Sequence, residues 1–242
     1  MISEFNLTEK EKVLIIAPHP DDETFGCGGL MLRYPNQCDV LLVTDGRKGH
    51  VGDYCGREDE LVKVRENEFL KIINMVGIHG FYKLDVPDGE SSNYRDRINS
   101  FNFEEYDYVF FPNRYDENKD HAIWYRTLKR LKRKFHYKYI MMEYEVGTLL
   151  HYTPVYSFLT EDILNKKKCM IEEYKSQLED INYLRSVIAL NIFRGEYAGV
   201  DYAEAYCPSE YVTLFRRVYS NLPLRYKERI RGFLHRNENK SI

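Results

Sequence analysis

Residues 13–23 read VLIIAPHPDDE, an unbroken apolar run followed by one histidine and three carboxylates within five residues. The run Val13–Ala17 is short and apolar throughout, which is typical of a buried strand in a parallel sheet. Open α/β sheets carry their chemistry just beyond the carboxyl ends of strands. The segment Pro18–Glu23 lies at that position, so we expect it to be functional. The alternative is a polar turn that caps the following helix.

Similar apolar runs recur along the chain, separated by patterns typical of helices. Further buried strands are predicted at 39–44, 81–84, 108–111 and 139–142. Helices are predicted from the first motif to about 33, over 58–75, near 94–101, over 122–134 with a basic outer face, and over 160–194 with a break near 177–180. This alternation predicts an α/β fold with a Rossmann-like, doubly wound, mostly parallel sheet and helices on both faces.

The loops that follow these strands should meet at one edge of the sheet, because right-handed crossovers bring the strand ends together. The loop holding His19 and the glycine-rich loop that starts at Asp45 are two of them. The turn at Asp88 and the loop ending at His121 are the other two. Three glycines in the first predicted helix, at 26, 28 and 29, favour close packing of that helix on the sheet.

The length of 242 residues suits one large α/β domain. The sequence contains no internal repeat, low-complexity tract or linker. We therefore predict a single domain over 1–242. Its core spans about 13–215, including short extended pieces at 202–206 and 211–215, and a basic C-terminal helix follows at about 222–234.

Composition excludes several classes of protein. The formal net charge of -3 argues against a general polyanion binder, so no nucleic-acid partner is expected. No run approaches the roughly 20 apolar residues of a membrane span, and the first residues do not resemble a signal peptide. The five cysteines lack CxxC spacing, which is typical of reduced thiols in a cytoplasmic protein.

Two histidines and one aspartate are candidate ligands of a single metal ion. His19 and Asp22 lie three residues apart on the first loop, and His121 follows the fourth predicted strand. Two imidazoles and one carboxylate, with an open position for water, are a common catalytic zinc site. Asp21 is then free to act as the general base on that water. The alternative is that His19 is a loop residue that is hydrogen-bonded to the sheet and that His121 caps a helix.

At these residues the chain resembles the LmbE-like, or PIG-L, deacetylases. Members of this family are zinc-dependent enzymes that remove the acetyl group from N-acetylglucosamine conjugates. Pro18–Glu23 resembles the first motif of the family, and Asp120-His121 resembles its second metal motif. Two further pairs are similar to C-terminal features of the family, Ser176-Gln177 and Arg194-Gly195. The second pair ends the helical stretch predicted over 160–194. The resemblance covers about residues 13–215.

The resemblance implies a role for each matching residue. The implied zinc ligands are His19, Asp22 and His121. Asp21 is implied as the general base, and Asp120 as a carboxylate that orients a ligand or the acid. Asn118 stands where many members have a histidine that helps to protonate the leaving amine or to stabilise the oxyanion. Asparagine can donate a hydrogen bond but cannot transfer a proton at neutral pH, which leaves Asp21 as the candidate for both base and acid.

Two residues are candidates for binding the substrate. Family members have an arginine at a place similar to that of Arg65, facing the sugar. The alternative for Arg65 is a helix-surface residue paired with Glu68 or Asp59. Asp88, before Gly89, is either a sugar-hydroxyl acceptor or an ordinary turn residue.

These inferences predict a zinc-dependent hydrolase that removes the N-acetyl group from an N-acetylglucosamine-type amino-sugar conjugate, using metal-bound water activated by an aspartate. One alternative is a non-haem iron oxygenase-type site, since the same ligands suit Fe²⁺. Another is an inactive sugar-binding homologue, which Asn118 favours. A nucleotide-binding Rossmann protein is disfavoured because no G-x-G-x-x-G follows the first strand. The basic C-terminal helix is a candidate for peripheral contact with an anionic membrane surface, and a homo-oligomer is left open.

Overall fold

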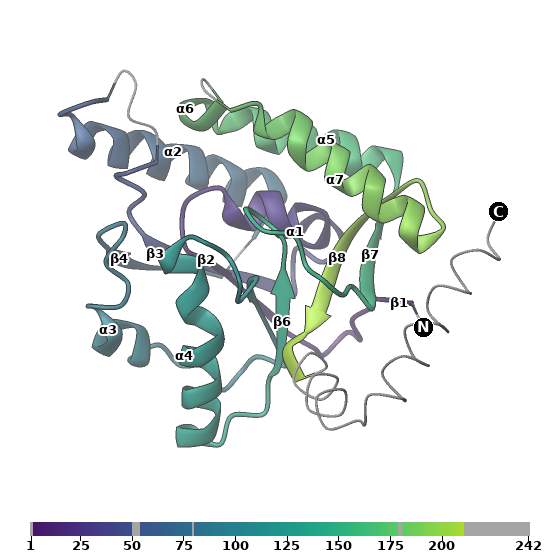
Figure 1. Ribbon diagram of the computed structural model, residues 1–242, viewed down its shortest axis with the longest axis horizontal. Coiled ribbons are helices and arrows are strands. Elements are labelled where there is room, and N and C mark those ends of the chain that lie inside the picture. Colours follow the sequence, from purple (N-terminus) through teal and green to yellow (C-terminus); the bar gives the residue numbers. More distant parts are fainter. Residues whose placement is uncertain (1, 50–53, 79, 179–180, 211–242) are drawn as a thin grey trace, which may run out of the picture. The chain divides into compact units, whose positions relative to one another are not determined.

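Eight strands form one sheet in the order β1-β7-β8-β6-β5-β2-β3-β4 (Figure 1). Their bounds are β1 (Ser3–Glu4), β2 (Val13–Ala17), β3 (Cys38–Thr44), β4 (Phe81–Val86), β5 (Tyr108–Pro112), β6 (Ile140–Tyr144), β7 (Val155–Leu159) and β8 (Tyr202–Pro208). Neighbouring strands run parallel except where β8 pairs with β6 and with β7. The predicted mostly parallel sheet is confirmed.

This computed structural model describes residues 2–49, 54–78, 80–178 and 181–210. Residues up to Pro208 form one unit of the chain, and a second unit starts at Ser209. The extended piece predicted at 211–215 and the basic helix predicted at 222–234 lie outside the described residues. The prediction of a single domain over the whole chain therefore stays a prediction.

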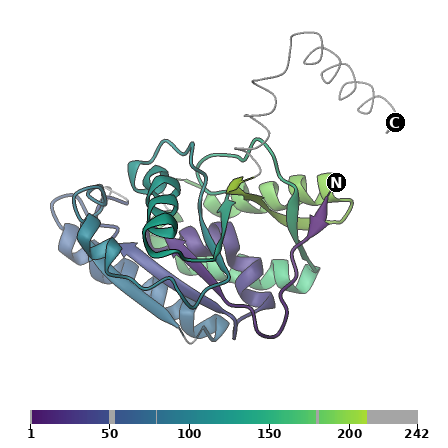
Figure 2. The same cartoon turned by 90° about the horizontal axis from the view of Figure 1, so that it is seen from below.

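Helices cover both faces of the sheet (Figures 1 and 2). Their bounds are α1 (Asp22–Arg33), α2 (Glu58–Val76), α3 (Arg95–Asn99), α4 (Lys119–Phe135), α5 (Glu161–Glu173), α6 (Lys175–Leu178) and α7 (Tyr183–Ala198). Side chains of α1, α2, α5 and α7 pack against one face of the sheet, and those of α3 and α4 against the other. None of the helices in the described part of the chain is long and apolar enough to cross a membrane.

The first predicted strand, β2, is apolar throughout because it lies between two other strands and is covered by helices on both faces of the sheet. β2 pairs with β3 on one side and β5 on the other, and all five of its side chains are buried. Val13, Ile15 and Ala17 point to the face covered by α1. Leu14 and Ile16 point to the face covered by α4. The loop after β2 therefore starts from a rigid, fully enclosed strand.

Besides the two-residue strand β1, which was not predicted, three larger features of the fold differ from the prediction. The strand β7 (VYSFL) was not predicted, because five residues directly before a helix are too few to show a regular pattern. Its antiparallel pairing with β8 is a tertiary contact. The helix α4 begins three residues before Ala122, because the Asn118 side chain accepts the Asp120 N–H at 2.9 Å and caps it.

The third difference is the end of α7, which runs past Arg194-Gly195 to Ala198 and ends at Gly199 with φ 75°. Gly195 does not end the helix, and its lack of a side chain allows α7 to pack closely against the backbone at Asp201. A Cβ at this residue would lie 2.5 Å from the carbonyl oxygen of Asp201.

The glycines of α1 let that helix lie against the sheet, as predicted. A Cβ at Gly26 would lie 2.2 Å from Cδ2 of Tyr144 in β6, whose ring is buried. We expect Gly26→Ala to lower the free energy of unfolding by about 1–3 kcal/mol, because the helix or the ring must move. Urea denaturation followed by circular dichroism measures this change.

Gly28→Ala in the same helix is the matched control. The three atoms nearest to a Cβ there are methylene carbons of Lys167, the closest at 3.2 Å. Alanine also gains roughly 1 kcal/mol of helix propensity over glycine. We expect this variant to be close to neutral, and equal losses for both variants would contradict the packing argument.

Candidate metal centre

The four predicted loops meet at the carboxyl ends of β2, β3, β4 and β5. The His19 Nδ1 atom lies 3.0 Å from Nε2 of His121, although the two residues are 102 positions apart. The His19 Nε2 atom lies 3.3 Å from Oδ1 of Asp88, whose own N–H donates to Oδ1 of Asp45 at 3.2 Å. Parallel strands have thus brought together loops that are distant in the sequence.

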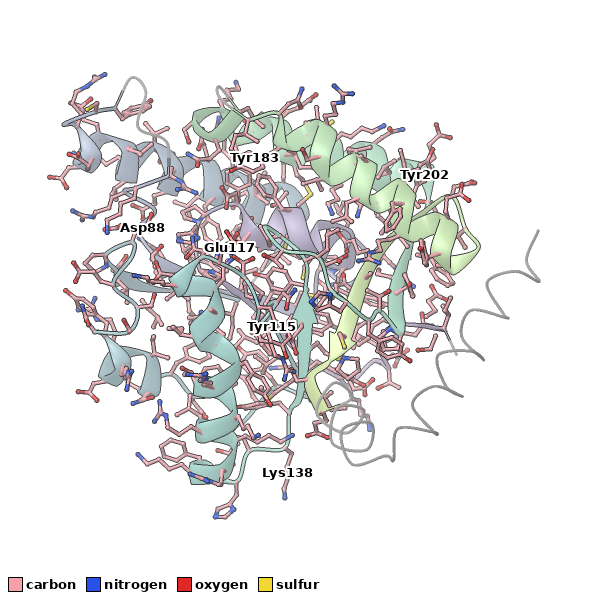
Figure 3. The ribbon with its side chains drawn as sticks, viewed as in Figure 1. Asp88, Tyr115, Glu117, Lys138, Tyr183 and Tyr202 are labelled. Carbon is pink, nitrogen blue, oxygen red and sulfur yellow. The ribbon has the colours of Figure 1, made fainter. Side chains whose placement is uncertain are left out.

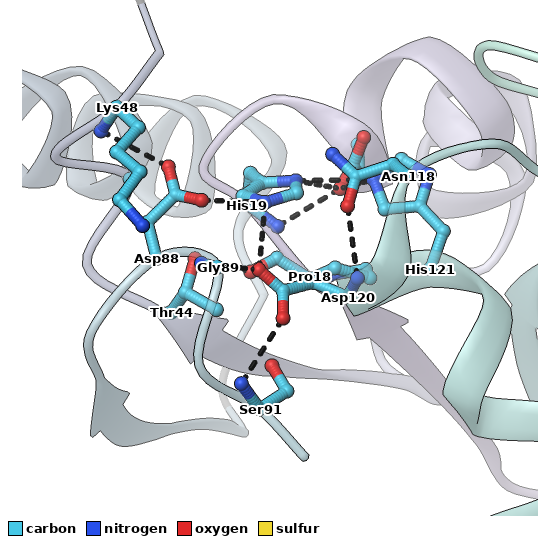
Figure 4. A network of polar contacts seen from close by, with 12 residues as sticks. Pro18, His19, Thr44, Lys48, Asp88, Gly89, Ser91, Asn118, Asp120 and His121 are labelled. Atoms are coloured by element: carbon cyan, nitrogen blue, oxygen red, sulfur yellow. Dashed lines mark hydrogen bonds and ion pairs between the residues drawn. The ribbon is translucent and has the colours of Figure 1, made fainter. Parts of the chain in front are cut away.

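Three candidate ligand atoms, one each from His19, Asp22 and His121, form a nearly equilateral triangle. Figure 4 labels the two histidines, whose side chains point toward one another. Asp22 Oδ2 lies 3.2 Å from His19 Nδ1 and 3.1 Å from His121 Nε2, and the two nitrogens are 3.0 Å apart. The backbone N–H of His19 donates to the same Asp22 oxygen at 2.8 Å, which fixes the carboxylate in this orientation. All three residues are buried.

The size of this triangle fits a small divalent ion. Zinc–ligand bonds of about 2.0–2.2 Å in a tetrahedron place neighbouring ligand atoms roughly 3.4 Å apart. The observed separations of 3.0, 3.1 and 3.2 Å are slightly shorter. Zinc commonly binds two imidazole nitrogens and one carboxylate oxygen, and other divalent ions, including Fe²⁺, bind the same ligand atoms. The residues present therefore fit the metal that the sequence predicts.

Carboxylates lie behind both imidazoles, on the nitrogens that face away from the triangle. His19 Nε2 is 3.3 Å from Asp88 Oδ1 and 3.6 Å from Asp120 Oδ2. His121 Nδ1 is 3.4 Å from Asp116 Oδ2. A carboxylate in this position fixes the tautomer of a histidine and aims its other nitrogen at a metal. Asp116 was not predicted, although its place in the loop before His121 was a usable signal.

The same carboxylates shift the proton affinities of the histidines. Burial opposes protonation, but hydrogen bonds with Asp120, Asp22 and Asp88 raise the pKa of His19 well above its ordinary value. Burial likewise opposes protonation of His121, but the negative charge of Asp22 and the contact with Asp116 outweigh it and raise the pKa of His121 to about 9. The negative cluster therefore favours positive charge at the ligand atoms, and a bound divalent cation would supply it in place of protons.

Asp21 lies beside the triangle and is held in an unusual backbone conformation. Its φ of 138° is outside the region that L-residues normally adopt, and such strain is concentrated at functional sites. Its Oδ2 accepts a hydrogen bond from Arg65 Nη2 at 2.9 Å. Burial raises the pKa of Asp21 to about 8, against the opposing charge of Arg65. This carboxyl can therefore hold or release a proton near neutral pH.

Arg65 is a buried residue, so the helix-surface alternative is wrong. Its side chain is only 2 % exposed. Besides Asp21 it binds two carbonyl oxygens, those of Pro20 at 2.8 Å and Gly46 at 2.9 Å. Glu68, the suggested partner, instead accepts hydrogen bonds from the N–H and the hydroxyl of Ser176. Arg65 ties the first loop to the glycine-rich loop after β3.

The structure gives partners to the other predicted site residues. Asp120 accepts the N–H groups of Gly89 at 2.6 Å and Ser91 at 3.1 Å, so it also anchors the turn after β4. Asp88 accepts the N–H of Lys48 at 3.1 Å in addition to its contact with His19. Asn118 is exposed, and its side-chain oxygen caps α4. The helix-capping role considered for His121 belongs to Asn118.

A cavity of about 590 Å³ adjoins the triangle, and all three candidate ligands line it. Asp21, Arg65, Asp88 and Asn118 also line it. The wall formed by α7 and the loop after β6 was not predicted. It is largely apolar, with Val146, Leu149, Tyr183, Val187 and Leu190. Figure 3 labels Asp88 and Tyr183, which approach the cavity from two elements far apart in the sequence.

One ion pair holds the loop after β6 in place. Arg194 of α7 donates to both carboxylate oxygens of Glu145, through Nε at 2.9 Å and through Nη2. Glu145 also accepts the N–H of Leu150 at 2.7 Å. The arginine that was expected to end a helix therefore shapes a wall of the cavity.

Comparison with known proteins finds a matching family model and a shared fold. Residues 14–132 match the family model PIG-L, described as GlcNAc-PI de-N-acetylase. Over 96 residues the chain is 28 % identical to a 1D-myo-inositol 2-acetamido-2-deoxy-alpha-D-glucopyranoside deacetylase of Kineococcus radiotolerans. That match covers 37 % of this chain and 26 % of the relative, about a quarter of its length.

Solved structures share the fold over most of the chain. An N,N'-diacetylchitobiose deacetylase from Pyrococcus horikoshii superposes with a TM-score of 0.70 at 23 % identity, covering 82 % of this chain and 84 % of the other. A conserved protein from Thermus thermophilus, TT1542, has a TM-score of 0.68 at 21 % identity, covering 82 % and 94 %. Together with the match of residues 14–132 to the PIG-L family model, this shared fold agrees with the resemblance of the first motif to the PIG-L, or LmbE-like, family.

Proposed function

We propose that this protein is a metal-dependent hydrolase that removes the N-acetyl group from an N-acetylglucosamine-type amino-sugar conjugate. The observation that carries the proposal is the triangle of His19 Nδ1, Asp22 Oδ2 and His121 Nε2, with the carboxyl of Asp21 next to it. The family match and the names of the relatives, which are deacetylases of acetamido sugars, support this substrate class.

His19, Asp22 and His121 would hold the metal, and zinc is the ion that we propose. When bound, a divalent ion of this kind polarises a carbonyl oxygen and lowers the pKa of a bound water towards roughly 7. The carboxylates behind the imidazoles would keep His19 and His121 aimed at it.

Asp21 would move the proton of the reaction. Its carboxylate takes one proton from the attacking water, whose oxygen then bonds to the acetamide carbon. When the carbon–nitrogen bond breaks, Asp21 returns that proton to the leaving nitrogen, which becomes the free amine of the sugar. The second product is acetate. The single carboxyl serves in both directions because Asn118 cannot transfer a proton.

Only the NH₂ group of the Asn118 side chain is available for the reaction. The oxygen is bound to the Asp120 N–H, so the remaining group is the NH₂, which can donate to a developing oxyanion. Arg65 and Asp88 line the same cavity, and direct contact of either with the sugar stays a prediction. Cytoplasmic location and self-association also stay predictions.

Replacing Arg65 by lysine tests its role in positioning Asp21. Lysine keeps the charge but cannot donate at once to Asp21, Pro20 and Gly46 in the arrangement that the guanidinium makes. We expect kcat to fall about 10- to 100-fold, in keeping with misplacement of a catalytic group. The bound metal should stay at one ion per chain. An unchanged kcat with a raised KM would instead indicate that Arg65 acts on the substrate alone.

The experiment that tests the function is a panel of N-acetylhexosamine conjugates incubated with the zinc-loaded protein and assayed for acetate and new primary amine. Release of both in equal amounts is expected, with loss on chelation and recovery on adding zinc. An iron oxygenase would consume oxygen and require Fe²⁺, and an inactive binding homologue would bind a conjugate without turnover. Oxygen uptake without acetate release would refute the proposal.

A further inference from the structure

A second cavity of about 590 Å³ lies along α4, and none of its lining residues lines the cavity at the metal centre. Five of its lining side chains are cationic, and none is acidic. The cations are Arg95, Arg114, Lys119, Arg126 and Arg130. We call these five residues the basic cavity. The sequence already indicated a basic outer face on this helix, and the proposed hydrolase has no use for it.

The helical repeat of α4 places several of these cations on one stripe. Lys119, Arg126 and Arg130 recur at spacings of seven and four residues, which keeps them on the same side of a helix. Arg95 comes from the first residue of α3, which lies beside α4 (Figure 1), and Arg114 from the loop after β5. Three separate segments thus supply positive charge to one concave surface.

Most of this charge is not neutralised within the protein. Arg114 is paired with Glu143, and Arg130 donates to the neutral Asn99 side chain at 2.7 Å. For Arg95, Lys119 and Arg126 no side-chain hydrogen bond or ion pair is found among the described residues. The chain as a whole has a formal net charge of -3. The basic cavity therefore gathers positive side chains on a protein that is negatively charged overall.

The arrangement is electrostatically unfavourable without an anion. Lys119 is the first residue of α4, at the end where the helix dipole disfavours a cation. Arg126 and Arg130 are like charges four residues apart on a helix, a spacing at which they repel. A bound anion would relieve both repulsions.

The residue types indicate which anion. Four of the five cations are arginines, whose planar guanidinium donates two parallel hydrogen bonds to a phosphate. A volume near 590 Å³ is in the range of small-molecule sites, and a concave wall suits a compact ligand better than a flat surface. We propose that the basic cavity binds a soluble ligand that carries two or more phosphate groups.

Calorimetric titration of the full-length, metal-loaded protein with inorganic tripolyphosphate tests this proposal. The variant is Arg126→Gln with Arg130→Gln. The matched control is Lys129→Gln with Arg133→Gln, which removes the same charge at the same spacing from residues of α4 outside the cavity. We expect the Kd to rise at least tenfold in the first variant and less than twofold in the control. Acetate release should be unchanged in both.

Two results would overturn the proposal. One is the absence of tripolyphosphate binding to the unaltered protein. If that protein then sedimented with anionic phospholipid vesicles, and only the first variant lost this property, the basic cavity would be assigned to a membrane surface. The other is an equal loss of affinity in the two double variants, which would indicate general charge attraction.

Discussion

Asp21→Asn is expected to lower kcat/KM for acetate release by about 10³-fold, while one metal ion per chain still binds. The reason is that a positioned general base contributes roughly 10²- to 10⁴-fold, and here one carboxyl would act as both base and acid. Asparagine keeps the size of the side chain and an oxygen that can accept from Arg65. Asparagine and aspartate are both among the residues found most often at positive φ, and the φ of this residue is 138°.

The pH profile makes this prediction specific to proton transfer. In the unaltered enzyme the rate should rise with pH as the base loses its proton, and this acidic limb should be absent in Asp21→Asn. Metal content and thermal unfolding are measured on the same samples. A variant that deacetylates at the unaltered rate would remove Asp21 from the mechanism. A variant that loses its metal would show that Asp21 holds the ion rather than moving a proton.

The fold was predictable because its central strands are enclosed on both faces. A strand such as β2, with every side chain buried, must be apolar throughout, and that pattern is visible in the sequence. The meeting of His19 and His121 followed from the parallel order of the strands. It did not depend on the exact strand ends, so the early start of α4 left the prediction intact.

The contacts that position the site were much less predictable, because they are made between segments. The sequence marks Arg65 as one charged residue in a charged helix, and its burial depends on the loops that fold over it. The pair of Arg194 and Glu145 is similar, since the two residues are 49 positions apart. Burying such charges is costly unless each finds its partner, and only the folded chain shows which partners meet.

His121→Ala should remove the metal from the protein and with it the activity. Structural zinc sites bind with about 10–16 kcal/mol through four ligands, so that each ligand accounts for roughly 3–4 kcal/mol. We therefore expect the Kd for zinc to rise by roughly 10²- to 10³-fold. Competition with a chromophoric chelator measures this constant without any substrate. The result therefore does not depend on the proposed reaction.

Asp116→Asn is the graded comparison for this experiment. Asp116 contacts the far nitrogen of His121 at 3.4 Å and would not touch the metal. Removing its charge should weaken zinc by about 10- to 100-fold, the usual cost of losing a carboxylate behind a metal-binding histidine. The order of the two effects follows from the geometry, because one variant deletes a ligand atom and the other only frees its ring to turn. Equal affinities in His121→Ala and in the unaltered protein would mean that the ion is held elsewhere, and the triangle of His19, Asp22 and His121 would no longer be the metal site.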